Sequence, residues 1–131
     1  MQPWIAYGQT QPIYGAAVDN PPLNTNSLRG ECASLPYTVP EGYELVIKAY
    51  GLESYGNVAG GLVLVPWIGD GPPTNAQCLH SVFSDNQSNE TVGVRFHLPA
   101  GKKLNVRIMC NENPAQVVGW YVRGTLVPVI P

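Results

Sequence analysis

The chain has 131 residues, which is enough for one domain with a real hydrophobic core. Only 12% of the residues are charged and the formal net charge is -2, so the sequence lacks the basic surface with which proteins bind nucleic acid. The 14 Gly and 13 Pro residues make a turn-rich composition that argues against a helical protein. No segment reaches the roughly 20 apolar residues of a membrane span, and no basic segment precedes an apolar run at the N-terminus, so we expect neither a membrane partner nor a signal peptide.

Residues 1–34 are predicted to form an extended, Pro-rich arm. They contain only three charged residues and keep neither a helical nor a strand period. Such a segment has too few apolar residues for a core of its own, so we expect its own domain or a neighbouring chain to hold it in place. The residues expected to anchor it on a partner are its aromatic and aliphatic side chains: Trp4, Ile5, Tyr7, Ile13 and Tyr14.

Residues 35–131 are predicted to form strands separated by turns. The expected strands are 35–39, 43–52, 62–68, 77–83, 91–98, 104–110 and 116–128. Residues 62–68 are apolar on both faces, which is typical of a central strand, and Pro66 predicts a bulge or a strand end there. We therefore predict an all-β protein, a jelly-roll-like antiparallel β-sandwich (35–131) with an extended N-terminal arm (1–34).

Two segments of the chain begin alike. Residues 39–48 read VPEGYELVIK, and residues 98–110 read LPAGKKLNVRIMC. Each predicts a turn that starts a strand, with Pro40 and Pro99 at the second turn position and Gly42 and Gly101 at the fourth. The repeat indicates a sheet built from two related halves.

The cysteines and histidines could in principle meet as zinc ligands. Cys78 and His80 lie two apart on one predicted strand, and His97 and Cys110 lie on others. The close spacings typical of structural zinc sites are absent, so we expect no metal and no cofactor. We interpret Cys32, Cys78 and Cys110 as buried free thiols, with one disulfide and one free thiol as the alternative.

No pattern in the sequence indicates an enzyme. The acidic residues lie near turns and in loops, with no spacing that would pair two of them across a cleft, and the G-x-S-x-G motif of hydrolases is absent. An aromatic surface for sugar is the main rival to a role in assembly. Trp67, beside the loop that holds Asp70, and the loop residue Asp85 would form this alternative carbohydrate- or receptor-binding site.

Three features resemble one family: the Pro-rich arm before a compact sandwich, the turn LPAGKKLNV at residues 98–106, and the closing segment GWYVRGTLVP at residues 119–128. These are similar to the small jelly-roll decoration (cement) proteins of tailed-bacteriophage capsids and to related head-fibre and tail-spike modules. The resemblance covers residues 35–128. It implies a non-enzymatic structural protein of the virion, made in the host cytoplasm, that sits on the capsid surface as a homotrimer. Its arms would dock on capsid protein and on sibling subunits.

Overall fold

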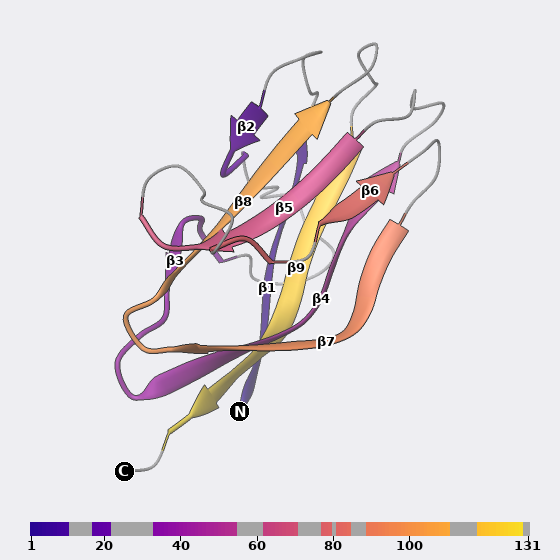
Figure 1. The fold of residues 1–131 in the computed structure, drawn as a ribbon. Coiled ribbons are helices and arrows are strands. Elements are labelled where there is room, and N and C mark those ends of the chain that lie inside the picture. Colours follow the sequence, from indigo (N-terminus) through magenta and orange to yellow (C-terminus); the bar gives the residue numbers. More distant parts are fainter. Residues whose placement is uncertain are drawn as a thin grey trace.

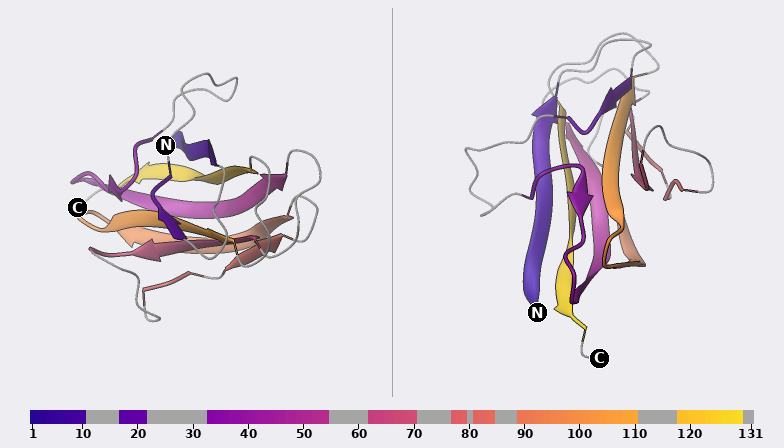
Figure 2. Two further views of the ribbon diagram at one scale, coloured as in Figure 1. Left: turned by 90° about the horizontal axis from the view of Figure 1, so that it is seen from above. Right: turned by 90° about the vertical axis from the view of Figure 1, so that its left-hand side faces the viewer.

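Two antiparallel sheets pack face to face in the computed structural model (Figure 1). The structure describes residues 1–10, 17–21, 33–54, 62–70, 77–79, 81–84, 89–110 and 118–129. Its strands are β1 (Gln2–Thr10), β2 (Ala17–Asp19), β3 (Tyr37–Thr38), β4 (Tyr43–Ser54), β5 (Leu62–Ile68), β6 (Val82–Ser84), β7 (Asn89–Pro99), β8 (Lys103–Cys110) and β9 (Val118–Pro128). One sheet has the order β1-β9-β4-β7 and the other β2-β8-β5-β6, with β3 also paired to β8. Figure 2 shows the two layers edge-on. The predicted all-β antiparallel sandwich is confirmed.

The N-terminal segment contributes strands to both sheets. β1 pairs with the central strand β9 along its whole length, and β2 pairs with β8. Trp4 and Ala6 point into the core, and the Ala33 N–H donates a hydrogen bond of 2.8 Å to the Ile5 carbonyl. The expectation of an arm outside the fold is therefore wrong for these strands, which share their sheets with strands that follow residue 34. The composition of this segment did not predict β1, because the strand needs few apolar residues. Its backbone hydrogen bonds are made with β9, and two inward side chains attach it to the core.

The core fills the space between the sheets. Its buried residues alternate along the strands, for example Leu104, Val106 and Ile108 in β8, as expected for side chains that point to opposite faces in turn. Fully buried members with the largest side chains include Trp120, Tyr50, Leu45, Ile47, Leu52, Leu64, Leu104 and Ile108. β9 lies between β1 and β4, and β5 lies between β8 and β6, so both segments take central places.

The two similar turns lie side by side. The Val39 N–H donates to the Lys102 carbonyl, and the Gly101 N–H donates to the Val39 carbonyl, each at 2.9 Å. In both turns the Pro carbonyl accepts from the N–H three residues later, at 3.2 Å: Pro40 from Tyr43, and Pro99 from Lys102. Each Pro is therefore first in its turn and each Gly third, one place earlier than predicted. The third position needs the positive φ that Gly42 (85°) and Gly101 (86°) adopt.

Pro66 lies inside β5 without the predicted bulge or strand end. It pairs in register with Val106 of β8, and its carbonyl accepts a 2.8 Å hydrogen bond from the Leu79 N–H on the other side. Because the N–H and C=O positions of a strand residue face the same neighbour, the missing N–H faces residues 77–79 and costs no bond to β8. The predicted strand 77–83 is shorter than expected. It consists of β6 and an isolated bridge between Trp67 and Cys78.

Candidate functional site

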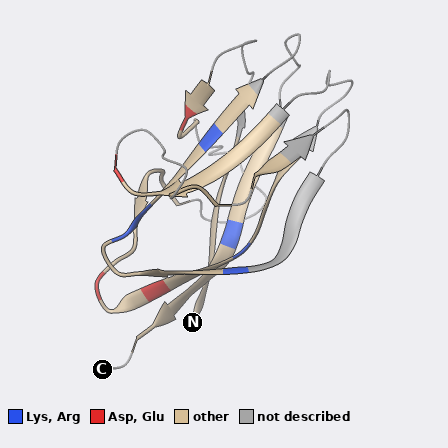
Figure 3. Ribbon diagram, in the orientation of Figure 1, with Lys and Arg blue, Asp and Glu red and all other residues tan. Residues whose placement is uncertain are grey.

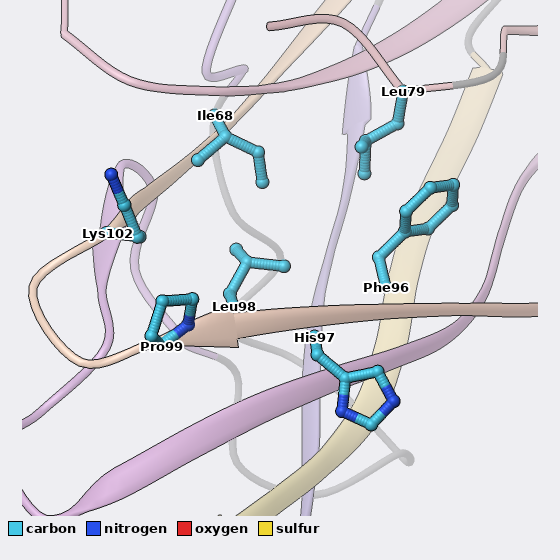
Figure 4. A pocket seen from close by; sticks show the side chains of 7 residues that line it. All are labelled: Ile68, Leu79, Phe96, His97, Leu98, Pro99 and Lys102. Atoms are coloured by element: carbon cyan, nitrogen blue, oxygen red, sulfur yellow. The ribbon is translucent and has the colours of Figure 1, made fainter.

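An apolar pocket of about 250 Å³ opens between the two sheets beside β7 (Figure 4). It is lined by Ile68, Leu79, Phe96, His97, Leu98, Pro99 and Lys102. Figure 4 shows Phe96 and Leu98 projecting from β7 toward Ile68 and Leu79, while the His97 ring points to the opposite side of the strand. The pocket is therefore formed by the end of β5, by Leu79 next to the bridge residue Cys78, and by the last residues of β7.

The pocket exists because the second sheet narrows at this end. β6 pairs with residues 62–64 of β5, and in the described part of the chain the edge beyond Leu64 is continued by residues 77–79. On the facing sheet β7 continues to Pro99. The mismatch leaves Ile68, Leu79 and Phe96 packed on the core but only partly buried.

Most charged groups around the pocket have a partner. Lys103 Nζ lies 2.8 Å from an Asp70 carboxylate oxygen, and His97 Nδ1 contacts Glu44 Oε1. Lys102 is exposed and forms no ion pair with any residue that the structure describes. Lys102 is therefore the positive charge at the rim that a bound group could use.

Trp67 is not available as a sugar platform. Its side chain lies on the outer face of the second sheet and is only 2% exposed, with the Arg107 guanidinium 5.7 Å from the ring centre. Asp70 is exposed and paired with Lys103, as described above, and Asp85 lies outside the described residues. The alternative site is thus not assembled around an accessible ring.

The same arginine ties β2 to its sheet. Arg107 donates two hydrogen bonds to the Asp19 carboxylate, at 2.5 and 2.9 Å. These bonds lower the pKa of Asp19 and raise that of Arg107. Beside this pair, the 6%-exposed Asn105 donates to the Gly69 carbonyl at 2.8 Å and accepts from Asn20 Nδ2 at 3.1 Å. This polar group joins β2, β8 and the end of β5, and its role is structural.

The residues predicted to bind a partner take several places. Trp4 is 6% exposed and packs within its own core instead of a neighbour's pocket, and Tyr7 is 5% exposed. Ile5 is half-buried on the outer face of its sheet. Ile13 and Tyr14 lie outside the described residues. Trp4 and Tyr7 are therefore not part of an exposed surface.

Among the three cysteines, the structure describes the side chain of Cys78. Cys78 is a half-buried free thiol. Cys32 and His80 lie outside the described residues, as does the side chain of Cys110. In the described part of the chain no group of three or more His, Cys, Asp or Glu side chains is placed to hold a metal ion, and no helix there is long and apolar enough to cross a membrane.

Sequence reasoning missed the pocket. In residues 91–98 apolar and polar residues alternate, and this pattern alone predicts that Phe96 and Leu98 share the inward face of a strand. That the second sheet stops short opposite them depends on pairing between β5 and β6.

Comparison with known proteins gives one solved structure. No family model matches the chain, and no curated protein matches it. The crystal structure of FlhE matches with a TM-score of 0.45 and 18% sequence identity, over 94% of this chain and 96% of that chain. The resemblance to phage decoration proteins, with the virion location and the capsid-binding role that it implied, is withdrawn: no family model and no curated protein matches the chain, and the solved structure that matches is FlhE and not a capsid protein. A likeness at this TM-score and identity carries no conclusion about what this chain does.

Proposed function

We propose that this chain is a non-enzymatic protein-interaction module whose pocket receives one apolar side chain of a partner protein. The observation that carries the proposal is the size and lining of the pocket. Its volume of about 250 Å³ lies below the roughly 300–1,000 Å³ of pockets that enclose a whole small-molecule ligand. An anchor residue such as Leu or Phe fits such a space, and Lys102 at the rim favours an acidic neighbour of that anchor.

The ionisable groups around the pocket support a binding role over catalysis. His97 points away from Phe96 and Leu98 and contacts Glu44 on the outer face (Figure 4). Lys102 is the other ionisable group of the lining. A catalytic acid, base or nucleophile must lie within hydrogen-bond reach of the reacting group, and the His97 ring does not face the pocket.

We also propose that the sandwich is a jelly roll. The support is the order of its strands. With the two-residue β3 set aside, the first, eighth, third and sixth strands form one sheet, and the second, seventh, fourth and fifth form the other. This is the order that two Greek keys produce when eight strands fold into two sheets. Homotrimeric assembly with sibling subunits, and the lack of a nucleic-acid or membrane partner, remain proposals that sedimentation and binding assays would test.

A simple probe tests the pocket. Burial of one Leu or Phe side chain contributes about 1.5–3 kcal/mol, which corresponds to a dissociation constant on the order of 10 mM. We expect N-acetyl-phenylalaninamide, titrated to tens of millimolar, to shift the methyl NMR signals of Ile68, Leu79 and Leu98. The signal of Leu45, which is 0% exposed in the core, serves as the internal control.

The matched variant fills the pocket. Leu79→Trp should abolish the shifts at Ile68 and Leu98 without changing the amide spectrum of β9, because Leu79 lies at the pocket and is only partly buried. Shifts that are absent in the wild type, or that persist unchanged in the variant, would show that the pocket does not bind apolar side chains.

A further inference from the structure

The pocket by itself is too small to hold a partner protein. One buried side chain gives a dissociation constant on the order of 10 mM, whereas specific complexes bind far more tightly. A partner therefore needs a second set of contacts next to the pocket. The inference that follows rests on the proposed function and identifies those contacts.

The edge of β7 borders the pocket. β7 is the end strand of its sheet, and β4 is its strand partner there, from Glu44 opposite Pro99 to Ile47 opposite Phe96. In an end strand every second residue directs its N–H and C=O away from the sheet. Residues 95–98 thus present main-chain donors and acceptors beside the pocket, and no other strand in the described ranges pairs with them. Figure 1 shows this part of β7 at the border of the sandwich.

We propose that an extended segment of a partner protein adds to the edge of β7 beside residues 95–98, as a fifth strand of that sheet, and places one apolar side chain in the pocket. Paired strands lie about 4.8 Å apart, and packed sheets about 10 Å apart. Because Phe96 and Leu98 face the space between the sheets, alternate side chains of an added strand face the same space. One of them meets the opening between Phe96 and Leu79.

The charges select an acidic segment. Arg95 lies on the outer face of β7 and Lys102 in the turn that follows, and neither forms an ion pair with a described residue. Lys103 already pairs with Asp70, and His97 already contacts Glu44. Figure 3 shows Lys and Arg positions in blue on β7 and near the start of β8. Residues on either side of the apolar anchor point outward in a strand, so Asp or Glu at those positions would lie near Arg95.

A peptide series tests this proposal. The parent is the acetylated, amidated heptapeptide TTDLDTT, whose central Leu is the anchor. We expect binding to the full chain with a dissociation constant below about 1 mM, measured by NMR titration, and slower hydrogen exchange at those amides of residues 95–98 that face away from β4. Replacing the Leu by Gly should weaken binding at least about tenfold, as should replacing both Asp by Lys. N-methylation of one alternate set of amides should abolish binding, and N-methylation of the other set should not, because only one set faces β7.

Two variants of the chain complete the test. Lys102→Glu should weaken the parent peptide several-fold, while Gln2→Glu, which adds a negative charge at an exposed position of β1 at the opposite edge of the sheet, should leave it unchanged. Equal binding by both N-methylated peptides, or no peptide binding by a protein that still binds N-acetyl-phenylalaninamide in its pocket, would overturn strand addition and leave the proposed function standing. Failure of N-acetyl-phenylalaninamide as well would overturn both.

Discussion

Gly124 in the central strand β9 has no room for a side chain. It lies opposite Ile47, where β4 shifts register. A Cβ atom added there would lie 2.1 Å from the Val46 carbonyl oxygen, 3.0 Å from the Val46 carbonyl carbon and 3.1 Å from the Ile47 Cα. All three atoms are main chain, so no side-chain rotation relieves the contact.

The cost of Gly124→Ala follows from this geometry. A carbon–oxygen contact settles at about 3.3 Å, so β9 and β4 would have to separate locally by roughly 1 Å. That displacement lengthens neighbouring cross-strand hydrogen bonds beyond their useful range, at about 0.5–1.5 kcal/mol each, and overpacking adds about 1–3 kcal/mol. We expect a loss of about 3–5 kcal/mol, a large share of the 5–15 kcal/mol that stabilises a typical domain.

Urea unfolding followed by tryptophan fluorescence measures this loss. The control is Gly42→Ala, because a Cβ at Gly42 would meet nothing within 4 Å and only the positive φ of 85° opposes it. That strain costs about 1–2 kcal/mol. If Gly124→Ala destabilised the protein by less than Gly42→Ala, the close approach of β9 to β4 at Gly124 would be refuted.

Three further substitutions test the polar contacts. Asp19→Asn should lower the free energy of unfolding by about 0.5–1 kcal/mol near pH 7. Because Arg107 lowers the pKa of Asp19, the stability from this pair is present above the pKa of an unfolded Asp and is lost as the pH falls. The urea midpoints of wild type and variant should therefore converge near pH 3. Asn105→Leu should cost about 1–3 kcal/mol in urea unfolding and speed hydrogen exchange in β2, since it removes a buried side chain that bonds both Asn20 and the half-buried Gly69 carbonyl. Unchanged exchange in β2 would count against this link. Burial raises the pKa of Tyr50 to about 12, so stability that is intact below pH 10 falls by at most about 3 kcal/mol as the pH rises through 12. Tyr50→Phe should make this alkaline loss of stability smaller. An equal loss in both proteins would show that Tyr50 is not its source.

The pocket shows where sequence reasoning stopped. Alternation placed Phe96 and Leu98 on the inward face of their strand, which the structure bears out. It could not place Leu79, because residues 77–79 have no clear period, and their position follows from hydrogen bonds with Pro66 and Ile68 of β5. Trp67 shows the same limit. Its two-sided apolar segment does not say whether the ring is core or surface; in the structure it is 2% exposed, and Arg107, 40 positions later in the chain, lies over it.

By itself the sequence determined the local elements of this protein. The Pro-x-Gly turns, the alternation in β7 and β9, the two-sided apolarity of β5 and the all-β class follow from neighbouring residues, because turn geometry and strand period are short-range properties. Only the tertiary structure decided that β1 is an edge strand, and that the second sheet ends short of β7 and opens a pocket there. Those outcomes depend on hydrogen bonds between strands far apart in the chain, and a period of two reports which side chains share a face but not what covers that face.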